Sequence, residues 1–305
     1  EQQGAMHIEV ECSFYRTNTC RSCNLAANKK WGMKHYLYDG PPSPSRRGHI
    51  YCVDDWSNWV GLDHKPLAVM ELEVLRKSDR VIAASESLQE RLQKLGFEST
   101  LLTHGVDTSH WQGAVCSEVV NFLDGLQRPL VVQWGLINQN LDLDALAQLS
   151  DDMNEGTIVL VGPEVDPDSR LDRIKRLARF PRISYDHLPG LAQQASVLVM
   201  AYQANEATIA SQPLKLKEYM ATGRAVVARS IPATLDWADA IDLYTSSSEF
   251  SSSVRNRIAT GVEPSQVAAR RRLDVESWET KARSFGSTVT GQEIDQALQI
   301  RLDAP

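Results

Sequence analysis

The sequence predicts an α/β protein of two domains, each with a parallel sheet covered by helices. From about Pro129 onward, short β-branched runs alternate with amphipathic stretches. These runs are continuously apolar, which is typical of strands buried on both faces, and their alternation with helices favours right-handed βαβ units. The same alternation recurs with fewer elements in the first half, and 305 residues suffice for about two domains of roughly 150 residues each.

The second half contains six expected strands separated by helical patterns. The strands are expected at 129–135, 157–162, 182–186, 196–202, 224–230 and 240–245. The helices between them are expected at 141–153, 169–180, 187–195 and 214–223. Six strands in this order make a complete doubly wound domain. After residue 245 the pattern is helical, at 249–260, 264–273, 275–285 and 292–302, with Arg270, Arg271 and Arg272 expected on a solvated helix face.

The first half has a smaller set of elements. Strands are expected at 49–55, 79–85 and 99–105, with two further strands at 8–14 and 34–39. Helices fit at 65–77 and 86–95, the second with Ser85 as its N-cap. Residues 1–50 lack the glycine-rich first turn of dinucleotide-binding folds, so this sheet is reduced, divergent or represented by an incomplete chain. We expect a first domain over 1–112, a second over 113–285 and a helical tail over 286–305.

The composition argues against several classes of protein. A net charge of −7 argues against a broad basic surface for nucleic acid. The sequence has no run of about 18 apolar residues and no basic-then-apolar leader, so neither a membrane span nor a secretion signal is expected. The absence of an Asn-x-Ser/Thr sequon favours a cytoplasmic location. The amphipathic C-terminal tail leaves peripheral contact with a membrane open.

The five cysteines do not form the even set expected of a secreted disulfide framework. Cys20 and Cys23 have the spacing of two zinc ligands, and Cys12 with His35 or His49 would complete a set of four. A second CxxC or an HxxxH pair is missing from the sequence. Free thiols in a polar N-terminal segment are therefore the favoured alternative, and no metal site is predicted.

In open α/β sheets, ligands bind beyond the carboxyl ends of the strands, so the residues after each strand carry most of the information on function. Gly135 and Gly162 follow the first two strands of the second half, where a missing Cβ lets a backbone approach a ligand. His187 follows the third strand. Lys215 lies in the first turn of a later helix, and Glu218 lies three residues further on the same face. A helix N-terminus with a lysine suits a phosphate, and a carboxylate suits paired ribose hydroxyls, so the set predicts a nucleotide site.

Each of these features also has a plain structural interpretation. Lys215 and Glu218 would form a surface ion pair, and Gly135 and Gly162 would be ordinary strand-to-helix turns. His187 would lie on the surface or cap a helix. The order of these residues along the chain favours the nucleotide site over the separate interpretations.

The segment 201–233 resembles the nucleotide-sugar loop of GT-B glycosyltransferases, which have two facing Rossmann-like domains. The pattern Pro-x-Lys-x-x-Glu-Tyr-x-Ala-x-Gly-x-x-Val-Val, common in that group, is matched by Pro213, Lys215, Glu218, Tyr219, Ala221, Gly223, Val226 and Val227. The resemblance extends over about residues 50–285, and within GT-B it is to the group 1, or family 4, type. It implies two Rossmann-like domains, of which the N-terminal one is reduced or divergent.

The resemblance also implies roles for single residues. Lys215 would bind the diphosphate and act in catalysis, and Glu218 would bind the donor ribose. Asp55, or its neighbour Asp54, would face the transferred sugar or the acceptor hydroxyl, although the pair also suits a capped turn. The complete donor set implied is Gly135, Gly162, His187, Leu188, Gln212, Pro213, Leu214, Lys215 and Glu218.

The chain departs from the group's pattern at two places. Many retaining members carry a glutamate where Ala210 stands, and an Arg and a Lys often occur in the stretch that reads Leu-Ile-Asn-Gln-Asn at 136–140. Lys215 and the helix N-terminus would therefore carry more of the charge stabilisation, and an inverting mechanism with Asp55 as base is open. No metal is expected, because the adjacent Asp54 and Asp55 lack DxD spacing.

The expected activity is transfer of a sugar from a nucleoside-diphosphate sugar to an acceptor hydroxyl, with a UDP-sugar as the expected donor and without a metal or other cofactor. The acceptor would be a glycan, a lipid-linked molecule or a small molecule. Two alternatives are a catalytically inactive sugar-nucleotide-binding relative, suggested by Ala210, and a sugar-nucleotide epimerase of the same architecture.

Overall fold

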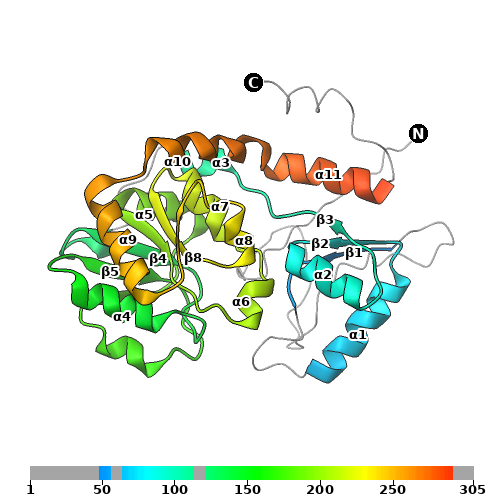
Figure 1. Cartoon of the computed structure of the whole chain (residues 1–305), viewed down its shortest axis with the longest axis horizontal. Coiled ribbons are helices and arrows are strands. Elements are labelled where there is room, and N and C mark those ends of the chain that lie inside the picture. The colour runs from blue at the N-terminus through cyan, green and yellow to red at the C-terminus, as the bar shows by residue number, and fades with distance from the viewer. Residues whose placement is uncertain (1–47, 56–63, 113–120, 291–305) are drawn as a thin grey trace. The chain divides into compact units, whose positions relative to one another are not determined.

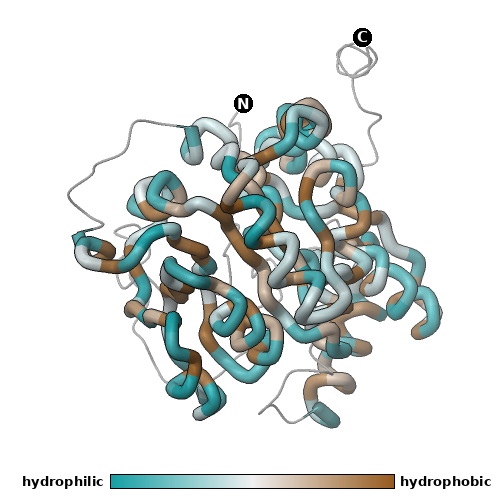
Figure 2. The backbone as a smooth tube through the Cα atoms, turned by 60° about the vertical axis from the view of Figure 1, so that its left-hand side comes forward, coloured by the Kyte–Doolittle hydropathy of each residue, from teal (hydrophilic) through white to brown (hydrophobic). Residues whose placement is uncertain are grey.

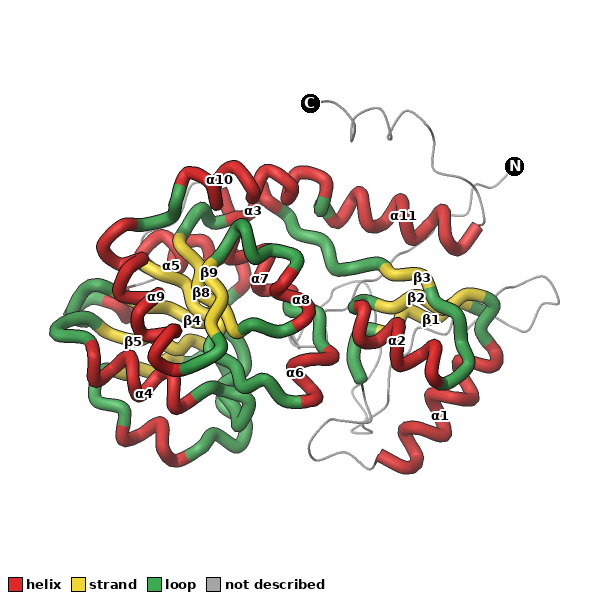
Figure 3. Tube along the Cα trace, in the orientation of Figure 1, coloured by secondary structure: helices red, strands yellow, loops and turns green. Residues whose placement is uncertain are grey.

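A computed structural model of the 305-residue chain describes residues 48–55, 64–112 and 121–290 (Figure 1). All of these residues belong to one unit, His35–Pro305. They form two parallel sheets, one with the strand order β1-β2-β3 and one with the order β6-β5-β4-β7-β8-β9. Helices flank the strands of both sheets (Figure 3). The predicted α/β class with parallel sheets is therefore confirmed.

The smaller sheet consists of β1 (His49–Cys52), β2 (Arg80–Ala83) and β3 (Thr100–Leu101), with helices α1 (His64–Lys77) and α2 (Glu86–Lys94). Leu75 of α1 and Leu92 of α2 are buried in one core with Ile50 of the sheet. The predicted N-cap Ser85 is confirmed, since its hydroxyl accepts a hydrogen bond of 3.1 Å from the backbone N–H of Leu88. Each strand of this sheet lies inside its predicted range and is shorter than it.

The larger sheet consists of β4 (Leu130–Trp134), β5 (Thr157–Val161), β6 (Leu177–Phe180), β7 (Val197–Met200), β8 (Ala225–Arg229) and β9 (Asp242–Tyr244). Every residue of β4, β5 and β7 is buried, as their continuous apolar runs predict. From β4 the chain proceeds outward through β5 and β6, and then returns to the other side of β4 with β7. The order of the strands therefore reverses between β4 and β7, where open α/β sheets bind their ligands.

Helices cover both faces of the larger sheet. On one face lie α4 (Leu143–Asp152) and α9 (Ser247–Thr260), and on the other lie α3 (Thr108–Gln112), α5 (Leu188–Gln194) and α7 (Leu214–Ala221). Figure 2 shows apolar and polar residues interspersed along the coiled segments, as expected of helices with one buried face. The shorter helices α6 (Glu206–Ala210) and α8 (Pro232–Leu235) follow β7 and β8. Two separate apolar cores, one on each face, hold the sheet between them.

Two elements of this half differ from the sequence prediction. The stretch 169–180, predicted as a helix, is a short 3-10 helix (Ser169–Arg173) followed by β6, and the strand predicted at 182–186 is a 3-10 turn at Tyr185–His187. β6 pairs only with β5 and is half-buried throughout, so it lacks the continuous apolar run of an inner strand. Leu171, Ile174 and Leu177 have helical spacing by coincidence, which misled the prediction.

The C-terminal part is helical, as predicted, with α10 (Pro264–Ala269), a 3-10 helix (Arg270–Val275) and α11 (Trp278–Thr290) after α9. The predicted solvated arginine face is wrong for Arg270. Its guanidinium is buried and donates hydrogen bonds to the carbonyl oxygens of Ala240 at 3.0 Å and Arg224 at 2.7 Å. Arg270 therefore holds the end of α10 to the strand edge of the sheet, and burial lowers its pKa to about 10.

Several expectations lie outside the described residues. They are the strands at 8–14 and 34–39, the helix at 292–302, and the candidate zinc ligands Cys12, Cys20, Cys23 and His35. Within the described ranges, no helix has the length and apolar character to cross a membrane. The same ranges contain no group of three or more His, Cys, Asp or Glu side chains arranged to hold a metal ion.

Candidate functional site

The carboxyl ends of β4 and β5 meet at a pair of glycines. Gly135, directly after β4, has a φ of +126°, which favours glycine, and its N–H donates a 2.9 Å hydrogen bond to the carbonyl of Val161. Gly162, directly after β5, lies against it so closely that a Cβ on Gly162 would be 2.7 Å from the carbonyl carbon of Gly135. The two backbones therefore touch where side chains would otherwise separate them, and both positions require glycine.

Lys215, from the first turn of α7, lies directly against Gly135. A Cβ on Gly135 would overlap the Lys215 ammonium group, so the glycine makes room for this cation. The Nζ of Lys215 donates a hydrogen bond to the hydroxyl of Tyr202 and lies 4.7 Å from the centroid of the Tyr202 ring. The structure thus brings together Gly135, Gly162 and Lys215, which the sequence pattern indicated separately. It also fixes the lysine cation at the end of β4.

The N-terminus of α7 carries no negative charge of its own. Pro213 is the N-cap residue and makes no side-chain capping bond, and the first turn contains no acidic side chain. By contrast, Ser246 and Glu249 form a complete capping box at the start of α9. The first backbone N–H groups of a helix lack intrahelical partners and attract anions, so the turn formed by Gln212, Pro213 and Leu214 suits a phosphate beside Lys215.

Glu218 lies one turn beyond Lys215 on α7, and it is half-buried. Burial raises the pKa of its carboxyl group to about 7, although Lys215, a hydrogen bond from Tyr185 and the Trp134 indole act in the opposite direction. The hydroxyl of Tyr185 lies 3.3 Å from Oε1 of Glu218. A carboxyl group that burial keeps near half-ionisation at neutral pH is costly to the fold, which is typical of functional sites.

Tyr185 and Trp134, which both act on the pKa of Glu218, belong to a group of aromatic rings that the sequence did not predict. The rings of His110 and Tyr185 are stacked, with centroids 4.3 Å apart and planes at 8°. Trp111 stacks on Trp134 at 5.5 Å, and Trp134 meets Tyr219 edge to face at 4.2 Å. Trp111 belongs to the core of the larger sheet. The signal in the sequence was the tryptophan directly before Gly135, at the end of a strand.

The other two expected donor residues lie on the same turn as Tyr185. Leu188 is buried in the core, so it supports the turn, and its side chain offers no surface for a ligand. His187 is half-buried at the N-cap of α5 and makes no capping hydrogen bond with its side chain. In the part of the chain that the structure describes, no hydrogen bond links His187 to Lys215 or Glu218.

Asp54 and Asp55 follow β1, and Asp55 is part of a buried ion cluster. A carboxylate oxygen of Asp55 lies 3.2 Å from Nε of Arg91, and the two terminal nitrogens of Arg91 bind Glu71 at 2.8 and 2.5 Å. Arg91 therefore joins two carboxylates, one on each side of its guanidinium. Asp54 lies beside this cluster, and burial together with the charge of Asp55 raises its pKa to about 7.

Lys217, two residues after Lys215, contacts a different part of the chain. It is buried, pairs with Glu276, and donates hydrogen bonds to the carbonyl of His104 at 2.5 Å and the hydroxyl of Thr103 at 3.2 Å. Residues two apart point in different directions from a helix, so the same helix presents one lysine to Gly135 and the other to residues 103–104. The sequence analysis did not separate these two lysines.

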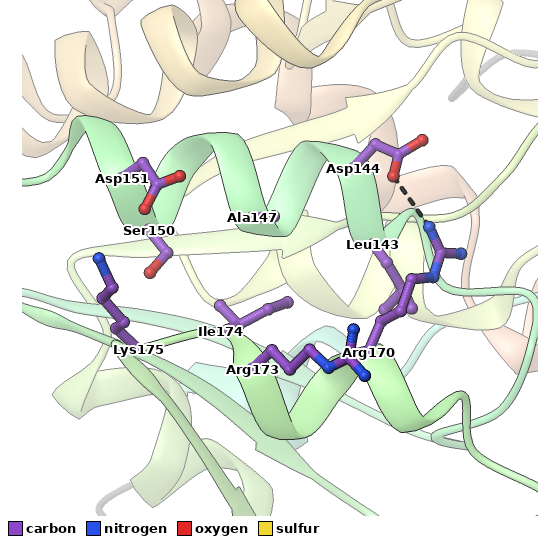
Figure 4. Close-up of a pocket in the computed structure, with 9 residues that line it drawn as sticks. All are labelled: Leu143, Asp144, Ala147, Ser150, Asp151, Arg170, Arg173, Ile174 and Lys175. Atoms are coloured by element: carbon purple, nitrogen blue, oxygen red, sulfur yellow. Dashed lines mark hydrogen bonds and ion pairs between the residues drawn. The ribbon is translucent and has the colours of Figure 1, made fainter.

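Two surface cavities lie elsewhere on the larger sheet. One of about 240 Å³ lies between α4 and the turn at Ser169–Arg173, and Figure 4 shows Arg170 there in an ion pair with Asp144. The other, of about 510 Å³, is lined by residues including Asp142, Arg229 and Ser246. Neither is lined by Lys215 or Glu218, so neither belongs to the candidate site.

Replacing Glu218 by glutamine should change how the stability of the protein depends on pH. The wild-type folded state keeps the Glu218 proton up to about pH 7, whereas the unfolded chain releases it near pH 4.5. As the pH rises from 4.5 to 7, the free energy of unfolding of the wild type should therefore fall by about 3 kcal/mol relative to that of Glu218→Gln. Above pH 8 the difference between the two proteins should stay constant. Denaturant titrations of both proteins at pH 5 and pH 8.5 measure this, and equal pH dependence would contradict the buried state of Glu218.

Comparisons with known proteins agree on the fold. No family model and no curated protein matches the sequence. Among solved structures, HepE from Anabaena, determined with UDP and glucose, superposes with a TM-score of 0.64 at 15% identity, over 81% of this chain and 72% of HepE. Sucrose-phosphate synthase from Thermosynechococcus elongatus gives 0.58 at 17% identity, over 78% of this chain and 64% of that one. Trehalose 6-phosphate synthase from Burkholderia multivorans superposes with a TM-score of 0.57 at 10% sequence identity, over 80% of this chain and 66% of the synthase.

These neighbours are GT-B glycosyltransferases, so the predicted resemblance is confirmed at the level of the fold. The chain spans less than two thirds of the length of the two synthases.

Proposed function

We propose that the chain is a glycosyltransferase that moves a sugar from a nucleoside-diphosphate sugar to an acceptor hydroxyl without a metal. One observation carries the proposal: Lys215, at the uncapped start of α7, lies against Gly135 of the glycine pair at the carboxyl edge of the sheet, and Glu218 follows one turn later on the same helix. This edge lies beside the point where the strand order reverses. A UDP-sugar is the proposed donor, and the UDP and UDP-glucose complexes of the structural neighbour HepE support this choice.

In the proposed mechanism, Lys215 and the first turn of α7 stabilise the leaving diphosphate. Negative charge grows on the β-phosphate as the bond to the sugar breaks, and fixed donors that already point at this position lower the barrier. The ammonium group is held by Tyr202 and by contact with Gly135, so little reorganisation is needed when the charge appears. Glu218 would hold the ribose, and the turn at His187 would flank the base.

The acceptor side of the reaction needs a base if the configuration inverts. Asp55 is the proposed residue, and its ion pair with Arg91 holds the carboxylate in a defined position. Asp54 has a pKa near 7, which suits proton transfer at neutral pH. The Asp54–Asp55 segment after β1 is therefore the proposed acceptor-side site. The place of the missing glutamate is occupied by buried Ala210, whose carbonyl accepts a 2.8 Å hydrogen bond from Ser85.

A sugar-nucleotide-binding relative without catalysis is the second candidate, and Ala210 together with the uncharged stretch 136–140 favours it. Residues of this stretch interact with other parts of the chain: the side-chain amide of Gln139 donates a 2.7 Å hydrogen bond to Asp166, and Ile137 is buried. Release of free nucleoside diphosphate in the presence of acceptor separates the two candidates. The active enzyme should release it repeatedly, and the inactive relative should bind the donor without turnover.

A thermal-shift screen with UDP, GDP, dTDP and ADP tests the nucleotide site itself. We expect UDP to raise the melting temperature by about 5 °C at a hundredfold excess over its Kd, because a ligand that binds only the folded state stabilises it. The variant Lys175→Ala, at an exposed position in the cavity of Figure 4, should respond like the wild type. Absence of a shift with all four nucleotides would contradict the proposed function.

A further inference from the structure

The carboxylate proposed to bind the ribose already has a hydroxyl partner. The phenol of Tyr185 lies 3.3 Å from Oε1 of Glu218, in the geometry in which a ribose hydroxyl would donate to it. The phenol comes from the turn at Tyr185–His187, which the resemblance places beside the nucleobase. The phenol therefore occupies one of the positions from which a ribose hydroxyl would donate to Glu218.

The Tyr185 ring is held in place from a distant part of the chain. His110, on α3, stacks face to face on it at 4.3 Å, and its Nε2 lies 3.3 Å from the carbonyl oxygen of Tyr185. Trp111 meets the same ring edge-on at 5.5 Å. The ring is nevertheless 37% exposed, so it has room to turn outward. The Tyr185 ring is therefore held by aromatic contacts and is also exposed on its solvent side, toward which it can rotate.

We propose that the Tyr185 hydroxyl occupies the ribose position on Glu218 when no nucleotide is bound and is displaced when one binds. Tyr185, held by His110, would thereby lower the affinity of the site for nucleotides. The donor ribose and the Tyr185 hydroxyl compete for Glu218, so the bond to Tyr185 must be lost before the nucleotide gains its own. A ligand that contacts only Lys215 and the start of α7 does not meet this competition. The inference rests on the proposed function, because it requires that a nucleotide occupies Glu218.

The competition predicts that the variants change the affinity for UDP and leave the affinity for pyrophosphate unchanged. UDP should bind Tyr185→Phe about three- to tenfold more tightly than wild type, because the variant keeps the stacked ring and loses only the competing hydrogen bond. His110→Ala should also tighten UDP binding, by about two- to tenfold, since the ring is then less firmly held. Inorganic pyrophosphate should bind wild type and both variants equally.

Isothermal titration of the full chain with UDP and with pyrophosphate measures these affinities. Tyr51→Phe is a matched control, because the Tyr51 hydroxyl donates to the carbonyl of Leu102 in the smaller sheet, away from Glu218. It should leave UDP affinity unchanged. UDP binding to Tyr185→Phe that equals or falls below that of wild type overturns the inference and leaves the proposed function standing. Wild type that binds pyrophosphate and no nucleoside diphosphate overturns both.

Discussion

Replacing Lys215 by alanine is expected to lower the rate of sugar transfer by at least about 100-fold, with the fold intact. Lys215 is the cation placed at the end of β4, and in the proposed mechanism its loss removes a fixed charge from the place where the leaving diphosphate develops its own. The side chain is only half-buried and interacts with Tyr202, so its removal leaves no deep cavity. Release of free UDP from donor and acceptor measures the rate, and circular dichroism checks the fold.

The neighbouring Lys217→Ala provides a contrast for this prediction. Lys217 is buried and paired with Glu276, so its removal leaves this carboxylate with Lys281 as its remaining ion-pair partner and opens a buried space, which should lower stability. Lys175→Ala, which removes an exposed lysine, should alter neither rate nor fold. Turnover of the Lys215 variant within a few-fold of wild type would remove this residue from the mechanism.

Gly162→Ala should destabilise the protein by about 3 kcal/mol or more and should abolish nucleotide binding. The added Cβ would overlap the backbone of Gly135. Neither backbone can yield easily, because β4 and β5 are paired along their whole length and are buried on both faces. Denaturant unfolding measures the loss of stability, and titration with UDP measures the loss of binding.

Gly286→Ala is the matched control for this change. Gly286 lies within α11 and a Cβ there would meet nothing within 4 Å, so alanine should leave stability unchanged or raise it by up to about 1 kcal/mol. A Gly162 variant that is as stable as the Gly286 variant would show that the glycine pair is not in close contact.

The inner strands of the larger sheet could be predicted because burial on both faces leaves a direct record in the sequence. β4, β5, β7 and β8 all appear as apolar runs at the expected places. β6 could not be predicted in this way, because an edge strand needs only one covered face and its residues are half-buried. Its side chains therefore follow no clear period, and the prediction placed the strand five residues too late.

The candidate site was predictable where it depends on spacing along one helix, as for Lys215 and Glu218. The contact of His110 with Tyr185 joins residues 75 positions apart, and nothing in either local pattern indicates it. The same limit applies to Asp55, whose partner Arg91 comes from α2. Ion clusters and aromatic stacks of this kind depend on tertiary packing, which a local pattern does not contain.

The two lysines of α7 have a mechanical consequence. The helix has eight residues, so it is a short rod about 12 Å long. Lys215 anchors this rod at Gly135, and Lys217 anchors it to the backbone of His104 and to Glu276 near the start of α11. The same short helix therefore joins Gly135 of the larger sheet to residue 104, which lies in the segment connecting the two sheets, so a ligand that shifted α7 would also move that segment.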